Sequence, residues 1–147
     1  MSSENAWLLD FGKPLRAAVG MRELLQIIDA SEIYEVPLTP AHSRHIMFWQ
    51  KRMIPVMDLS LRLGAKATQS KMLALVGYQD HANQSVGIGA IVLAAPPLKI
   101  AVDDADAAVL DEQTSGWREL AISGFAREGA VIPVLHLSRV FGQASYA

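Results

Sequence analysis

The stretch Arg52–Gly64, RMIPVMDLSLRLG, recurs near the end of the chain as Ala130–Gly142, AVIPVLHLSRVFG. Both copies contain Ile-Pro-Val, then Leu-Ser, then Gly, at one offset of 78 residues (132 − 54). Because proline cannot donate to a strand ladder, Pro55 and Pro133 are expected at an edge, a bulge or a corner. Each following Leu-Ser is expected to form one helical turn closed by glycine. The repeat therefore predicts two equivalent corners in one fold.

Two further motifs precede each copy in the same order. Leu8–Gly12 and Ala18–Leu25 precede the first copy, and Leu73–Gly77 and Ser85–Val92 precede the second, at offsets of 65 (73 − 8) and 67 (85 − 18). The rise from 67 to 78 places 11 extra residues (78 − 67) in the second half. The acidic segment Asp103–Gly116, which suits either a helix or a loop, is the expected place for them.

Short apolar segments separated by turn residues make up most of the chain, and this pattern is typical of strands. Two segments rich in Leu and Ala, Glu23–Ile28 and Gly89–Ala94, also suit a helix, but their glycine neighbours favour strands. The ten expected strands are Trp7–Gly12, Ala17–Met21, Glu23–Ile28, His45–Trp49, Arg52–Leu59, Lys71–Tyr78, Val86–Ala94, Leu98–Val102, Glu119–Phe125 and Ala130–Leu137.

These observations predict an all-β fold of two pseudo-symmetric five-stranded barrels, SH3-like or OB-like, packed on a shared core, since each barrel is too small to be secure alone. The chain, 1–147, is expected to form a single domain with one subdomain at about 13–70 and another at about 71–142. Exchange of terminal strands between the barrels is left open. The alternative is one β-sandwich whose edge strands resemble one another.

Composition excludes several classes of protein. A net charge of −2 with mixed signs gives no basic field for nucleic acid. The absence of cysteine excludes disulfides and thiolate metal sites and suits a reducing compartment. The N-terminus lacks the pattern of a signal peptide, and the longest apolar stretch, Val86–Leu98, is shorter than the roughly 20 residues of a spanning helix. We expect a cytoplasmic protein without direct membrane insertion.

The Pro-Val-x-Asp-Leu run at Pro55–Leu59, with the strand before it and the Leu-Gly after it, resembles the CheW-like domain, the coupling domain of bacterial chemotaxis. The resemblance extends from about Trp7 to Gly142 and identifies the chain as a diverged, stand-alone member. It implies two five-stranded barrels and a non-catalytic adaptor that links a CheA-type histidine kinase regulatory domain to a chemoreceptor cytoplasmic tip. Members of this kind also occur in systems that govern type IV pili and surface motility.

This sequence departs from the family just before that run. Where the family has an Asn-x-Arg-Gly pattern, this chain has Phe48, Gln50 and Lys51, and His45 stands in place of a usual Gly. Gln50 cannot supply the charged fork of an arginine. Strand alternation predicts Phe48 and Gln50 on one side and Trp49 and Lys51 on the other, with one aromatic exposed at the barrel junction. The candidate protein-binding residues are His45, Phe48, Trp49, Gln50, Lys51 and Arg52, with Glu35, Val36 and Pro37 from the preceding loop as a second choice.

No catalytic, cofactor or metal site is expected. His42 and His45 lack a third ligand, and Asp58 and its counterpart His136 are interpreted as turn residues that hydrogen-bond nearby amides. The acidic cluster Asp103–Glu112 lacks the ligand spacing of a calcium loop, and the glycines of Val86–Ala90 belong to no nucleotide-binding motif. The alternatives to an adaptor are a weakly self-associating structural protein and, third, a small ligand-binding or enzymatic barrel that uses the cleft between its halves.

Overall fold

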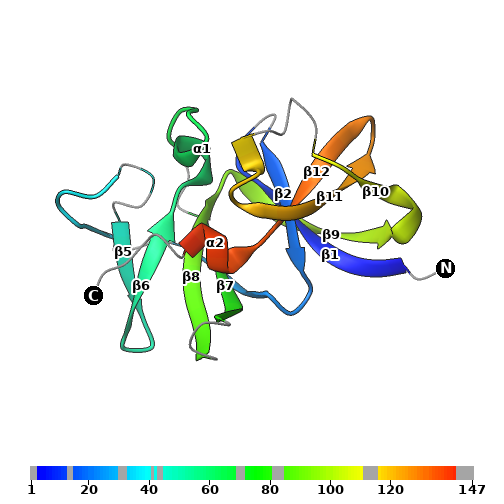
Figure 1. Cartoon of the computed structure of the whole chain (residues 1–147). Coiled ribbons are helices and arrows are strands. Elements are labelled where there is room, and N and C mark those ends of the chain that lie inside the picture. Colours follow the sequence, from blue (N-terminus) through cyan, green and yellow to red (C-terminus); the bar gives the residue numbers. More distant parts are fainter. Residues whose placement is uncertain are drawn as a thin grey trace.

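The computed structural model describes residues 3–12, 15–29, 33–40, 42, 45–68, 72–80, 85–110 and 116–141. The strands form two six-stranded mixed sheets (Figure 1). Sheet A has the order β10 (Ala107–Ala108), β11 (Ala121–Arg127), β12 (Ala130–Leu135), β2 (Arg16–Gly20), β1 (Ser3–Asp10) and β9 (Ala95–Asp103). Sheet B has the order β3 (Leu24–Asp29), β7 (Met72–Asp80), β8 (Ser85–Leu93), β6 (Arg52–Met57), β5 (His45–Trp49) and β4 (Tyr34–Glu35).

All ten expected strands are present, and the two ambiguous segments lie in strands. The two helical turns are also confirmed, as α1 (Leu59–Arg62) and α2 (Leu137–Phe141). Gly64 closes the first with φ +83, whereas Gly142 lies outside the described residues. The acidic segment begins with a 3-10 helix at Asp104–Asp106 and continues into β10; residues 111–115 are not among those described. The sequence missed only β4 and β10, which have two residues each.

The two sheets have the same strand order when one is read backwards, so β10-β11-β12-β2-β1-β9 corresponds to β4-β5-β6-β8-β7-β3. The fold is therefore the expected pair of pseudo-symmetric SH3-like barrels. Each sheet combines the first two strands of one repeat with the last four of the other: β1 and β2 pair with β9 and β12, while β7 and β8 pair with β3 and β6. A boundary near residue 70 therefore separates the two repeats, but each sheet contains strands from both sides of that boundary.

The register corrects the alignment of the repeats. Val56 pairs in parallel with Ala90, and Val134 pairs in parallel with Ala18, so Ala18 corresponds to Ala90 at an offset of 72 (90 − 18) and not to Ser85. Leu8 faces Ala18, and Leu75 faces Ala90, which gives an offset of 67 (75 − 8) for the preceding strands. Compared with the first repeat, the second repeat thus has five extra residues (72 − 67) between Leu75 and Ala90 and six (78 − 72) between Ala90 and Val134. The expectation that all lie in the acidic segment is wrong.

Each proline marks the point where its strand gains a second neighbour. Among the described pairs, β6 meets β8 only at Val56 and Met57, the residues directly after Pro55. In the other sheet, β12 meets β2 at Val134, directly after Pro133. The missing N–H of each proline therefore falls where the strand leaves an edge position, as expected for a corner.

The largest hydrophobic core joins the two sheets and both helices. Leu9 and Val19 from sheet A pack in one cluster with Ala74 and Ile91 from sheet B, and Leu59 and Leu137 contribute from the helices. Two smaller clusters lie on the opposite faces of the sheets, one around Leu73 in sheet B and one around Phe125 in sheet A, because their residues alternate along the strands with those of the shared core. This shared core explains how two small barrels reach a stable size.

Two glycines of the VGIGA segment make room for an aromatic stack. Gly87 and Gly89 lie on one face of β8 because side chains alternate along a strand. Tyr78 and Phe141 stack against this face with ring centroids 5.5 Å apart and an interplanar angle of 6°. A Cβ built on Gly89 would lie 2.4 Å from a ring carbon of Phe141. The spacing of these glycines is therefore architectural.

The turn between β5 and β6 places Gln50 and Lys51 in the left-handed region, with φ of +48 and +65. The equivalent turn of the second repeat has Glu128 at φ +51 and Gly129 at φ +81. Positive φ at both central residues is the signature of a type I′ hairpin, and it favours glycine at the second position. Lys51 thus holds a backbone conformation that costs a side-chain-bearing residue roughly 1 kcal/mol.

We expect Lys51→Gly to stabilise the protein by about 1 kcal/mol, because it removes this strain. Arg52→Gly is the matched control: it also removes one cation, but from an extended strand residue, and should destabilise by about 0.5–1 kcal/mol. Urea unfolding midpoints compare the two variants with the parent. A midpoint for Lys51→Gly at or below the parent value would show that the turn is not strained.

Candidate partner-binding surface

The expected binding residues lie at the outer edge of sheet B, where β4, β5 and the β5–β6 turn meet. Tyr34 and Glu35 of β4 pair with Ile46 and His45 of β5, and β5 continues into the β6 hairpin. Figure 1 shows this hairpin on the side of the molecule opposite to sheet A. The edge is thus formed by one local segment, residues 33–57, rather than by distant parts of the chain.

Phe48 is the centre of an exposed apolar patch, and its side chain is 58% exposed. The ring of Tyr34 meets that of Phe48 edge to face, with centroids 5.8 Å apart. Met53 pairs directly with Phe48 across the hairpin and is also exposed. We call Tyr34, Phe48 and Met53 the Phe48 patch. Sequence reasoning missed Tyr34, because its place beside Phe48 depends on the pairing of a two-residue strand.

Trp49 faces the other side of the sheet and packs against the cluster that contains Met47 and Ile54. The predicted opposition of Phe48 and Trp49 is therefore confirmed. The exposed aromatic does not lie at the junction of the sheets, which the large core fills, but at the outer end of β5. The predicted location is therefore wrong. Ile91 and Leu93 of β8 belong to the core at the junction, and β5 lies two strands away from β8 in the sheet.

The expected alternation stops at the turn. Gln50 and Lys51 are exposed, but their left-handed backbone takes them out of the extended strand, so they do not continue the faces of Phe48 and Trp49. Arg52, also exposed, begins β6. The hairpin tip therefore presents a polar and cationic end beside the Phe48 patch.

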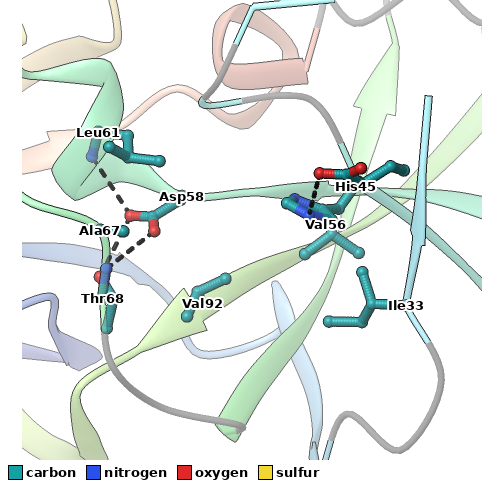
Figure 2. Close-up of a pocket in the computed structure, with 9 residues that line it drawn as sticks. Ile33, His45, Val56, Asp58, Leu61, Ala67, Thr68 and Val92 are labelled. Atoms are coloured by element: carbon teal, nitrogen blue, oxygen red, sulfur yellow. Dashed lines mark hydrogen bonds and ion pairs between the residues drawn. The ribbon is translucent and has the colours of Figure 1, made fainter. Parts of the chain in front are cut away.

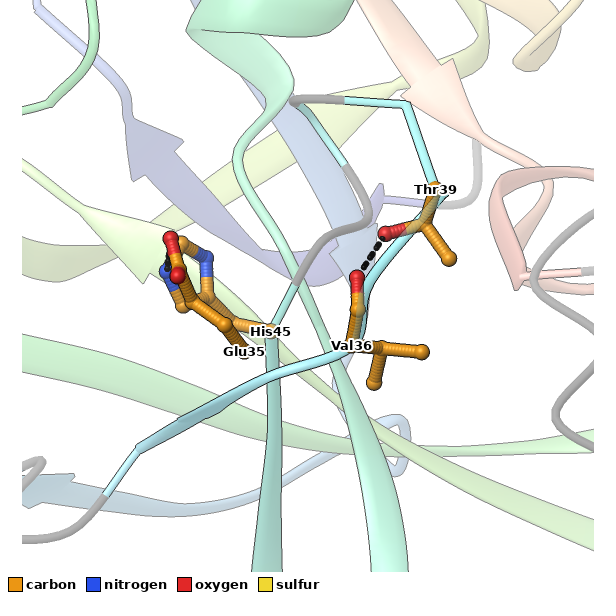
Figure 3. Close-up of polar contacts among 4 residues, drawn as sticks. All are labelled: Glu35, Val36, Thr39 and His45. Atoms are coloured by element: carbon orange, nitrogen blue, oxygen red, sulfur yellow. Dashed lines mark hydrogen bonds and ion pairs between the residues drawn. The ribbon is translucent and has the colours of Figure 1, made fainter.

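Glu35 and His45 lie on the face opposite to Phe48. His45 Nε2 is 3.9 Å from Glu35 Oε1, close enough for an ion pair when the imidazole is protonated (Figure 3). In the following turn the hydroxyl of Thr39 donates to the carbonyl of Val36 at 2.7 Å. Val36 is half-buried and Pro37 is exposed. The nine expected residues thus form two surfaces, the hairpin end with Phe48 and the side with Glu35 and His45, and Trp49 belongs mainly to the core.

A cavity of about 380 Å³ opens beside Glu35 and His45. Figure 2 shows His45 at one end, Asp58 at the other, and Val56 and Val92 between them. Glu35, the partner of His45, also lines the cavity. Asp58 is held in place by three hydrogen bonds, which it accepts from the Leu61 amide at 3.3 Å, the Thr68 amide at 3.0 Å and the Thr68 hydroxyl at 3.1 Å. The prediction that Asp58 bonds nearby amides is therefore confirmed.

His136, the counterpart of Asp58, behaves differently. Its Nε2 lies 3.3 Å from the Ser138 hydroxyl, and its buried Nδ1 has no hydrogen-bond partner among the described residues. No bond to a nearby amide is seen for its side chain within the described ranges, so that expectation fails for this residue.

From the sequence, His42 and His45 are interpreted as loop residues and not as metal ligands. Burial, and then the nearby Arg62 guanidinium, lower the pKa of His42 from the ordinary histidine value, so the imidazole is held neutral. No group of three His, Asp or Glu side chains comes together as a metal site in the part of the chain that the structure describes. In the same part of the chain, none of the helices has the length and apolar character needed to cross a membrane.

Comparison with known proteins places the chain in a family. Residues 12–91, which run from Gly12 to Ile91 near the end of β8, match the family described as CheW-like domain. This match covers more than half of the chain, and the chain belongs to the CheW-like domain family.

The fold agrees with that assignment. The crystal structure of the scaffolding protein TtCheW from Thermoanaerobacter tengcongensis superposes with a TM-score of 0.77 at 15% sequence identity. The alignment covers 99% of this chain and 98% of that one, so both barrels are matched. No curated protein matches the sequence.

Proposed function

We propose that this chain is a non-catalytic adaptor of a bacterial chemosensory system, acting in the cytoplasm and linking a CheA-type histidine kinase to chemoreceptors. The observation that carries the proposal is the CheW-like match together with the exposed Phe48 patch, whose central residue stands at the Asn position of the family's Asn-x-Arg-Gly pattern. A system that governs type IV pili or surface motility is the finer part of the proposal, and the diverged motif supports it.

The physical case rests on the composition of the hairpin end. Aromatic and methionine side chains that are exposed together are typical of the residues that dominate protein interfaces. The Phe48 patch combines two aromatic rings and a methionine and adjoins the exposed turn residue Lys51, whereas Arg52 pairs with Trp49 and lies on the opposite face. Methionine adapts to different partner shapes, so the patch can compensate for the missing family arginine with apolar contact.

The proposal is tested by calorimetric titration of the full chain with the regulatory domain of the histidine kinase from the same organism. We expect saturable binding, and a loss of at least tenfold in affinity for Phe48→Ala, since an exposed aromatic anchor contributes more than most interface residues. Val109→Ala is the matched control, because Val109 is also an exposed apolar residue, at 87%, but lies next to β10 in the other sheet.

The outcomes are distinct. Absence of binding by the parent chain at high micromolar concentration would contradict the adaptor role. Equal losses of affinity for Phe48→Ala and Val109→Ala would leave the adaptor role intact but would show that the Phe48 patch is not the binding surface. Self-association through the same patch is the second candidate function, and a sedimentation coefficient that rises with concentration in the parent but not in Phe48→Ala would favour it.

A further inference from the structure

The cavity between the Glu35–His45 pair and Asp58 has a lining that specifies the chemistry of its occupant. Its walls are aliphatic: Val56 and Val92 lie between the two polar ends (Figure 2), and Ile33, Leu61 and Ala67 complete the walls. No lysine or arginine is among the described residues that line it, whereas Glu35 and Asp58 each bring a carboxylate. The cavity thus offers an apolar channel with negative charge at both ends.

The two carboxylates differ in what they can offer a ligand. The three hydrogen bonds to Asp58 fix its orientation and occupy most of its acceptor positions. Among the described residues, Glu35 has only the distant contact to His45, at 3.9 Å, and its side chain is 69% exposed. Glu35 is therefore the group that is available to bind a cation, and Asp58 adds a fixed negative charge at the far end.

A second cavity, of about 190 Å³, lies at the equivalent place in sheet A. It is lined by Val134 and Gly20, the counterparts of Val56 and Val92, and it also has two acidic residues, Glu4 and Asp104, in its lining. The fold itself therefore leaves a hollow at this end of each sheet. The sheet B cavity differs from its counterpart in its lining and in its larger size.

We propose that the sheet B cavity binds the side chain of an arginine from a protein partner. Aliphatic walls suit the methylene stem, which long basic side chains bury along apolar surface. The planar guanidinium can donate two parallel hydrogen bonds to the Glu35 carboxylate, a geometry that an ammonium group cannot provide. The volume of about 380 Å³ accommodates one such side chain but not a folded segment. The cavity would thus recognise a single basic anchor on the face of sheet B opposite to the Phe48 patch.

The experiment is an NMR titration of the full isotope-labelled chain with N-acetyl-L-arginine N-methylamide. We expect saturable shifts at the amides of Val56, Thr68 and Val92 at millimolar concentration. The citrulline analogue, which has nearly the same shape without the charge, should cause shifts at least fivefold smaller. Glu35→Gln should weaken binding of the arginine probe at least threefold, whereas Glu128→Gln, the same change in an exposed turn, should not alter it. Ala67→Leu should abolish binding by filling the cavity.

Three results would overturn the inference: no shifts at these amides, equal shifts with the citrulline analogue, or equal affinity for Glu35→Gln and the parent. Tighter binding of free arginine than of the capped probe would also overturn it, because the occupant would then be a metabolite. Only one part of the inference rests on the proposed adaptor function, namely that the bound arginine belongs to a partner protein. Since the titration contains no kinase, its failure and a failure of kinase binding can be told apart.

Discussion

Replacing Gly89 with alanine is expected to destabilise the fold by about 2–3 kcal/mol, because a methyl group there would overlap the ring of Phe141 and overpack the core. The built Cβ lies 2.4 Å from one ring carbon and 2.5 Å from another. Phe141 is only 4% exposed and stacks on Tyr78, so it cannot turn away without leaving the core that joins the sheets. Thermal unfolding should show a midpoint lower by about 5–10 °C.

Gly116→Ala is the matched control for this change. Gly116 is exposed, and a Cβ there would meet only a leucine methyl at 3.4 Å, so we expect a change within about 0.5 kcal/mol. The second measurement is a double-mutant cycle with Phe141→Ala, which itself costs about 3–5 kcal/mol. In that background Gly89→Ala should cost much less, since the ring is gone. Additive losses would show that the glycine matters for another reason.

The sequence was sufficient for the features that depend on neighbouring residues. Alternation and turn residues located all ten longer strands, and the repeated Leu-Ser located both helical turns. Pro55 and Pro133 were correctly expected at corners, because the lack of an N–H is a property of the residue itself. The opposition of Phe48 and Trp49 also followed from a period of two. Each of these predictions needs only a few consecutive residues.

The remaining features depend on pairing between distant residues. The offset of 72 that relates Ala18 to Ala90 follows from parallel pairs between strands more than 30 residues apart, which no local pattern reveals. Strand exchange between the repeats has the same origin. Strand alternation was wrongly extended through Gln50 and Lys51, because this turn lacks the glycine that marks its counterpart at Gly129. The cavity beside Glu35 was missed because β4 brings only two residues to the sheet.

Replacing Asp58 with alanine is expected to cost about 2–3 kcal/mol, since its carboxylate joins helix α1 to the segment that follows the helix. It caps α1 through the Leu61 amide and ties down the segment after the helix through two bonds to Thr68. Loss of a helix cap costs about 1 kcal/mol, and each further hydrogen bond contributes about 0.5–1.5 kcal/mol. Urea unfolding followed by circular dichroism measures the loss.

The pseudo-symmetric position supplies the control for Asp58→Ala. His136 occupies the same place before α2, yet its Nδ1 is buried without a hydrogen-bond partner among the described residues. His136→Ala should therefore cost less than half as much as Asp58→Ala, because no cap is lost and an unsatisfied polar atom is removed. Equal losses at the two positions would mean that both residues act by packing alone, and the three hydrogen bonds of Asp58 would then contribute no net stability. The comparison thus isolates what the carboxylate adds at one of two equivalent corners.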